Sequence, residues 1–115
     1  MPRFVILEHD FPTCHWDFFL EAGSILRAWR LLDTPSFGGT CRAEQSPDHR
    51  LHYLDYEGPV SGGRGHVRRI DVGTYTRGSR EADLEEFWLE GSQFGERVSF
   101  VRAGDGWTCQ FKLRE

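Results

Sequence analysis

Alternation of apolar and polar side chains along short stretches is the feature of this sequence that most constrains its fold. In WTCQFKLR (107–114), every second residue from Trp107 to Leu113 is apolar, and the residues between them are polar. A period of two fits a strand with one buried face, because helical apolar positions recur every three to four residues. The pattern predicts a β-strand, and VSFVR (98–102), joined to it through AGDG, predicts a hairpin.

Other segments of the chain have the same extended character, and glycine-bearing turns separate most of them. They are FVIL (4–7), HWDFFLE (15–21), ILRAWRLL (25–32), LHYLDYEG (51–58), HVRRIDVGTY (66–75) and FWLEG (87–91). The segment EADLEEFW (81–88) is the only one with a helical pattern. We therefore expect one all-β domain covering 1–115, folded as a small closed or partly open antiparallel β-barrel of about seven or eight short strands, with little helix. Nine Phe and four Trp can fill its interior.

Several classes of protein are excluded by the bulk features of the chain. It has no apolar run of membrane length, and the apolar stretch after Met1 is too short for a secretory signal. Three cysteines with no CxxC pair indicate neither a disulfide framework nor a zinc ribbon, and Cys109 alternates with large apolar residues as a core filler would. We expect a soluble, cytoplasmic protein that does not act at a membrane.

The charge of the chain is uneven. The formal net charge is -4, which gives no global attraction to nucleic acid. Arginines nevertheless cluster between Arg64 and Arg80, and a strongly acidic stretch (81–90) follows. The cluster could touch a phosphate backbone through a few contacts, but a solvated strand face is the simpler interpretation from charge alone.

Histidines and carboxylates come together in EHDFPTCHWDFFLE (8–21). On a strand, His15 and Asp17 project from one face, and the large apolar residues that alternate with them project from the other. His9 precedes a short bend, DFP, that can fold it back over the same face. Two imidazoles and one carboxylate leave open positions on a divalent cation, as a catalytic site requires. His9, His15 and Asp17 are candidate ligands for manganese, zinc or iron.

A second stretch, DHRLHYLDYEG (48–58), offers a histidine and a phenol. On an extended strand His49 and Tyr53 would share a face. Such a pair can donate hydrogen bonds to a phosphate, or transfer a proton to a leaving oxygen. Taken alone, the stretch fits a turn histidine followed by a core tyrosine better.

Four stretches, in the same order, resemble the 3′-phosphoesterase domain of bacterial DNA ligase D. They are HDFPTCHWDFFLE (9–21), AWRLLDTPS (28–36), DHRLHYLDYEG (48–58) and IDVGTY (70–75). The family carries a histidine followed by HWDFRLE, then a SWA…PS segment, DHPLxYxxFEG, a glycine-rich hairpin and WDxGTY. The resemblance covers nearly the whole chain, and we expect a compact, free-standing relative without a polymerase or ligase module.

The resemblance implies a small β-barrel with a crescent-shaped, metal-binding groove. It implies manganese-dependent removal of a terminal ribonucleoside and then of a 3′-phosphate from DNA 3′ ends. By residue it implies His9, His15 and Asp17 as ligands of a divalent metal, Mn²⁺ before Zn²⁺, and His49 and Tyr53 as the catalytic pair that engages the phosphate. The implied partners are nucleic-acid 3′ ends, DNA or a DNA–RNA junction, and also a DNA repair ligase or polymerase.

The chain departs from the family where positive charge is expected. Phe19 stands in place of the arginine of HWDFRLE, and Asp33 in place of a lysine before PS. An arginine grips phosphate with two parallel N–H bonds and keeps its charge, whereas phenylalanine has no donor. Arg42, Arg50 and Arg64 are the candidate phosphate-binding residues that could supply the missing charge, and Arg42 is also the match for an arginine upstream of the family's DH pair.

Two functions follow as hypotheses. The first is a metal-dependent phosphoesterase acting on nucleic-acid 3′ ends in DNA end repair, with activity weakened at Phe19 and Asp33. The alternative is a non-catalytic metal-binding module that binds nucleic-acid ends or a repair partner. A mononuclear iron oxygenase has the same ligand types, two histidines and one carboxylate, but ranks below both because the ligase-like motifs occur in order.

Overall fold

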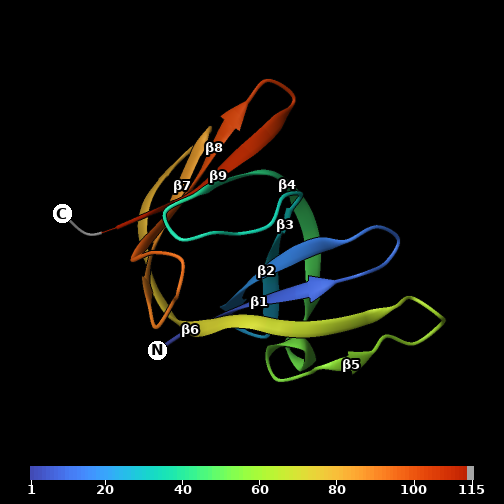
Figure 1. Ribbon diagram of the computed structural model, residues 1–115. Coiled ribbons are helices and arrows are strands. Elements are labelled where there is room, and N and C mark those ends of the chain that lie inside the picture. The colour runs from blue at the N-terminus through green and yellow to red at the C-terminus, as the bar shows by residue number, and fades with distance from the viewer. Residues whose placement is uncertain (114–115) are drawn as a thin grey trace.

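The computed structural model describes residues 1–113 and shows an antiparallel β-barrel (Figure 1). The elements in this part of the chain are β1 (Arg3–His9), β2 (His15–Ala22), β3 (Ile25–Leu31), β4 (Thr40–Arg50), the 3₁₀ turn η1 (Leu51–Leu54), β5 (Gly58–Pro59), β6 (His66–Glu81), β7 (Leu84–Glu90), β8 (Arg97–Ala103) and β9 (Gly106–Lys112). Neighbouring strands follow the order β1-β2-β3-β4-β9-β8-β7-β6, and β6 pairs back with β1 to close the barrel. The prediction of an all-β barrel with little helix is confirmed.

The larger apolar cluster is built of aromatic rings on one face of the strands. Trp29 stacks on Phe100 with 4.2 Å between ring centroids, and Phe18 meets Phe100 edge-on at 5.7 Å. Cys109 is fully buried among them, as predicted for a core filler. Tight packing of this kind holds the strands of the barrel in a fixed register.

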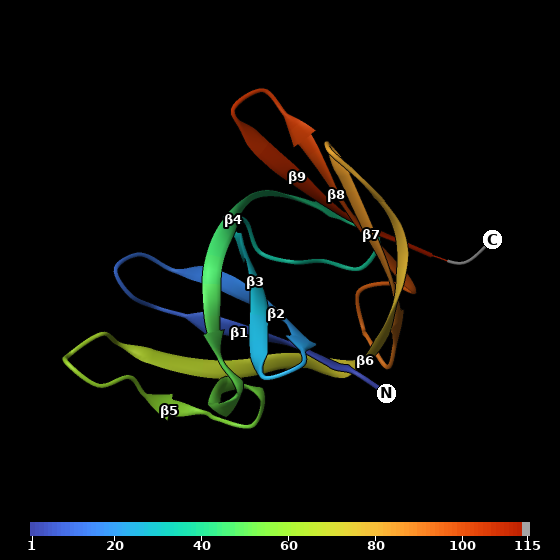
Figure 2. The same cartoon turned by 180° about the vertical axis from the view of Figure 1, so that it is seen from behind.

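A smaller apolar cluster lies on the opposite face of β1, β2 and β3. It contains Leu7, Phe19 and Leu26, and residues of η1 pack against it. Figure 2 shows η1 and β5 together beside β1 and β6. The predicted alternation of β2 is confirmed, because Phe18 belongs to the larger cluster and Phe19 to the smaller one. The face of Phe19 is the one that carries the candidate site.

One strand was missed in the sequence and one predicted strand is wrong. β4 occupies residues 40–50, where small and polar side chains hide the alternation, and it is recognisable only by its pairing with β3 and β9. Of residues 51–58, predicted as a strand, 51–54 form η1, and only Gly58 belongs to a strand, as the first residue of β5. Leu54, at the end of this turn, is buried in the smaller cluster.

The helical pattern of residues 81–88 does not produce a helix. Residues 82 and 83 form a turn, and β7 follows it, paired with both β6 and β8. Pairing on two sides outweighs the weak helical preference of EADLEEFW. The predicted strand 107–114 is β9, although Arg114 lies outside the described residues. No helix in the described part of the chain is long and apolar enough to cross a lipid bilayer.

Gly73, in the stretch IDVGTY, allows three strands to approach closely. It pairs with Phe4 of β1, and a Cβ atom at this position would overlap the backbone of Glu90 and the ring of Phe4. Glycine is therefore required where β1, β6 and β7 meet.

A salt bridge joins two strands that are not neighbours in the sheet. Both terminal nitrogens of Arg27, on β3, donate to the carboxylate of Glu85, on β7, at 2.7 Å. Glu85 is buried and also lies 3.5 Å from the exposed Arg80, and most of the Arg27 side chain is shielded from water, so loss of Glu85 leaves the Arg27 charge poorly solvated.

Replacing Glu85 by glutamine is expected to lower the free energy of unfolding by about 2 to 3 kcal/mol, because the Arg27 guanidinium loses its charged partner. Urea unfolding measures the change. The matched control is Asp83→Asn, which breaks the exposed pair with Arg102 and is expected to cost less than about 1 kcal/mol. Equal losses in the two variants would contradict a supporting role for the Arg27–Glu85 pair.

Candidate metal and phosphate site

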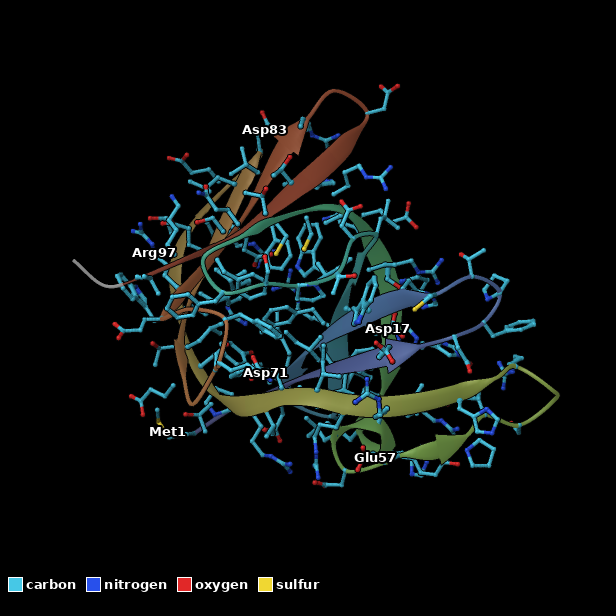
Figure 3. The ribbon with its side chains drawn as sticks, viewed as in Figure 1. Met1, Asp17, Glu57, Asp71, Asp83 and Arg97 are labelled. Carbon is cyan, nitrogen blue, oxygen red and sulfur yellow. The ribbon has the colours of Figure 1, made fainter. Side chains whose placement is uncertain are left out.

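The candidate metal ligands are brought together by the β1–β2 hairpin. His9 is the register partner of His15 at the loop end of the hairpin, and Asp17 lies two residues further along β2. The Nδ1 atom of His9 is 3.6 Å from one Asp17 oxygen, and the Nε2 atom of His15 is 3.3 Å from the other. One donor atom from each residue lies within 4.8 Å of the others. Figure 3 labels Asp17 on this hairpin.

Backbone carbonyl groups fix the orientation of both histidine rings. The Nε2 atom of His9 lies 2.8 Å from the carbonyl oxygen of Arg64, and the Nδ1 atom of His15 lies 2.9 Å from that of Thr13. A ring nitrogen that faces a carbonyl oxygen must carry the proton. The remaining nitrogen of each ring faces Asp17, and in the neutral imidazole it is the one with a free lone pair. This arrangement is typical of metal-ligating histidines and fits a divalent cation.

His15 and Asp17 are both buried, and their proximity shifts the titration of the histidine. The hydrogen bond to the Asp17 carboxylate raises the pKa of His15 above its usual value, while burial opposes the rise. The nearby positive charge of Arg30 also opposes the rise in the pKa of His15. Without a cation, a proton on His15 is therefore the natural partner of the carboxylate.

A divalent cation has to displace that proton, so its binding is expected to strengthen as pH rises through the raised pKa of His15. In the metal-free protein the sign is opposite. The His15–Asp17 pair stabilises the fold fully below the unfolded pKa of His15, and this contribution is lost as pH rises through the folded pKa. The shift in Tm caused by Mn²⁺ should thus be larger at about pH 8 than at about pH 6. An equal or smaller shift at the higher pH would contradict the ligand role of His15.

His49 and Tyr53 reach the same pocket from a different part of the chain. His49 lies near the end of β4 and Tyr53 lies in η1, so the two do not share a strand as predicted. Both rings instead pack on Phe19, with centroids 4.8 Å and 6.1 Å from its ring. The Nδ1 atom of His49 lies 2.7 Å from the carbonyl oxygen of Pro47, which leaves its Nε2 atom for a ligand.

These side chains line one pocket of about 270 Å³. Its polar lining comes from His9, His15 and Asp17, which together are called the metal cluster below, from His49 and Tyr53, and from two arginines. Apolar residues complete the lining. The lining residues are Leu7, His9, Phe11, Pro12, His15, Asp17, Phe19, Arg30, His49, Tyr53, Val60, Arg64 and Val67. A pocket with a few convergent polar groups on an apolar floor is the usual form of a small-molecule or terminal-group site.

Only one of the three arginines proposed from the sequence lies in this pocket. Arg64 lines it, but its guanidinium donates to the carbonyl oxygen of Ser61 at 2.7 Å. Arg42 is exposed, does not line this pocket and is bound side by side to Asp33. Arg50 is exposed at the end of β4 and does not line the pocket either. Asp33, which replaces the family's lysine, is therefore the ion-pair partner of Arg42.

Arg30 lines the pocket and was missed from the sequence. It is the register partner of Asp17 across β2 and β3. The available signal was the alternation in ILRAWRLL, which places Arg30 on the face opposite to Trp29. The sequence could not show that this face meets the metal cluster.

The family model of the DNA ligase D 3′-phosphoesterase domain matches residues 7–102. The multifunctional non-homologous end joining protein LigD of Pseudomonas aeruginosa is 33% identical over 106 residues, which cover 84% of this chain and 12% of that protein. The LigD protein of Mycobacterium tuberculosis is 32% identical over 123 residues, which cover 90% of this chain and 15% of that protein. The chain therefore spans only a small part of these relatives.

Proposed function

The chain belongs to the DNA ligase D 3′-phosphoesterase domain family, and we propose that it hydrolyses phosphoester bonds at nucleic-acid 3′ ends with the help of a divalent cation. The reactions proposed are removal of a 3′-terminal ribonucleoside and of a 3′-phosphate. The match to a phosphoesterase family supports the hydrolysis, and the two relatives, which are named for non-homologous end joining, support a role in DNA end repair. A repair ligase or polymerase is the proposed protein partner.

One observation carries the proposal. Donor atoms of His9, His15 and Asp17 lie within 4.8 Å of one another, in the pocket that also receives His49 and Tyr53. Because backbone carbonyls hold the rings of His9 and His15, the ring nitrogens that face Asp17 are positioned before a cation arrives. Two neutral nitrogens and one carboxylate suit Mn²⁺, and also Zn²⁺.

The chemistry divides between the two sides of the pocket. When bound, the cation would polarise a phosphate oxygen or lower the pKa of a bound water. His49, whose Nδ1 atom faces Pro47, directs Nε2 to the pocket and in its protonated form can donate a proton to the leaving oxygen. Tyr53 can donate its hydroxyl proton in a hydrogen bond to the phosphate and so orient it. Phe19 packs under both rings and keeps them in place.

A direct experiment incubates the folded protein with Mn²⁺ and a DNA primer that ends in a single ribonucleotide or in a 3′-phosphate. Shortened or dephosphorylated primer, dependent on Mn²⁺ and absent with a chelator, is the expected result. Absence of product from a folded protein with Mn²⁺ bound would rule out the catalytic function.

The second candidate is a non-catalytic module that keeps the metal cluster and binds nucleic-acid ends or a repair partner. It is favoured by one observation, the full burial of Phe19 at the position where the family has a phosphate-gripping arginine. This module would be stabilised by Mn²⁺ and would bind a DNA end without hydrolysing it. The primer assay therefore separates the two functions.

A further inference from the structure

Arg30 stands beside the metal cluster. It lies directly opposite Asp17 in the β2–β3 register, and Glu44 of β4 lies opposite Arg30. Directly opposed residues of antiparallel strands have Cβ atoms about 4.5 to 5.5 Å apart, so the three side chains form a row across the strands. The end of this row at Asp17 is in the pocket, which Arg30 also lines.

The guanidinium of Arg30 is only loosely held. Its closest ion-pair atom is an oxygen of Glu44 at 3.7 Å, and the Glu44 side chain is 52% exposed. Pairs of this kind contribute little and exchange readily with solvent. The Nε atom of Arg30 is buried and has no hydrogen-bond partner among the described residues. A buried donor without an acceptor is unfavourable, so a loosely held guanidinium that turns toward an anion in the pocket can gain the hydrogen bond that it lacks.

Two of the arginines proposed from the sequence, Arg64 and Arg42, are already engaged. Arg64 donates from Nε and from a terminal nitrogen to Ser61, which binds its guanidinium to its own loop. Arg42 donates to both oxygens of Asp33. Arg30 therefore combines a place in the pocket with donors that are available to a ligand.

We propose that Arg30 binds the phosphate group of the nucleic-acid 3′ end, and so supplies from β3 the positive charge that Phe19 cannot supply from β2. In the β2–β3 register Phe19 faces Ala28, and Arg30 lies two residues further along β3, on the same face. The positive charge that the family has on the strand of Phe19 is thus found on the neighbouring strand β3, still beside the metal cluster. This inference rests on the proposed function and names a specificity-determining residue for it.

The test measures binding in the metal-free protein, by fluorescence anisotropy with a labelled DNA oligonucleotide that ends in a 3′-phosphate and with the same oligonucleotide ending in a 3′-hydroxyl. Wild-type protein should prefer the 3′-phosphate. Arg30→Gln should reduce that preference by about tenfold to a hundredfold, because a hydrogen-bonded charge is lost. Arg30→Lys should retain part of it, since lysine provides a point charge but not the planar fork of arginine.

Arg102→Gln is the matched control, because it removes the same charge from β8, where Arg102 pairs with Asp83. Its preference for the 3′-phosphate should equal that of the wild type. Equal thermal stability of the variants would show that they are folded. An Arg30→Gln protein that keeps the full preference would overturn the inference, and so would a wild-type protein that has none.

Turnover with Mn²⁺ separates this inference from the proposed function. If the wild type prefers the 3′-phosphate through Arg30 but forms no product, the proposed catalysis fails and the binding role of Arg30 stands. If the wild type forms product and Arg30→Gln has the same kcat/KM, the role of Arg30 fails and the function stands. A higher KM in Arg30→Gln than in the control agrees with the inference.

Discussion

Replacement of Asp17 by asparagine is expected to abolish binding of a divalent cation in the pocket and to lower phosphoester hydrolysis by about a thousandfold or more. Asp17 supplies the negative charge of the cluster and touches both histidines, at 3.3 Å and 3.6 Å. Asparagine keeps the size of the side chain but not the charge that compensates a cation. The change is measured as loss of the Mn²⁺-induced rise in Tm and as loss of product from a 3′-phosphate primer.

The matched control for this variant is Asp71→Asn. Asp71 is as buried as Asp17, but on β6 it accepts hydrogen bonds from the Ser92 hydroxyl and the Gln93 amide, away from the pocket (Figure 3). Its substitution should change stability and leave the Mn²⁺-induced rise in Tm intact. An Asp17→Asn protein that responds to Mn²⁺ like the wild type would contradict the metal site.

Replacement of His49 by glutamine should lower turnover by about a hundredfold to ten-thousandfold while Mn²⁺ binding is unchanged. His49 is the histidine of the pocket that is not part of the metal cluster, and its Nδ1 is committed to the carbonyl oxygen of Pro47. Glutamine can still form a hydrogen bond with phosphate but cannot deliver a proton at neutral pH. Single-turnover rates with saturating Mn²⁺ measure the effect.

His66→Gln serves as its control, because His66 is exposed and pairs only loosely, at 3.8 Å, with Asp10. Turnover of this variant should match the wild type. Wild-type turnover in His49→Gln would remove His49 from the reaction. Loss of Mn²⁺ binding in the same variant would instead give His49 a place in the metal site.

The metal cluster was predictable from the sequence because it depends on local geometry. Alternation along a strand puts His15 and Asp17 on one face, and the short loop after His9 brings β1 back antiparallel to β2. The register that pairs His9 with His15 follows from these two features. The same alternation correctly separated Phe18 from Phe19.

The phosphate side of the site was less predictable because it depends on long-range pairing. His49 and Tyr53 were named from their types, but the chain turns into η1 between them. Whether Arg30, Arg42 or Arg50 reaches the pocket is decided by the β2–β3–β4 register, which the chain sets through contacts far apart in sequence. Arg30 is therefore visible as a pocket residue only in the folded protein.

We propose that the β1–β2 hairpin and the adjacent strand β3 form a single site that binds both a divalent metal and a phosphate. The most direct measurement is a crystal structure of the protein soaked with Mn²⁺ and phosphate, with the metal located by its anomalous scattering. We expect one manganese peak bound by Nδ1 of His9, Nε2 of His15 and an oxygen of Asp17, with a phosphate beside it in contact with the Arg30 guanidinium. A pocket without manganese, in crystals soaked at concentrations that raise the Tm of the protein in solution, would contradict this metal site.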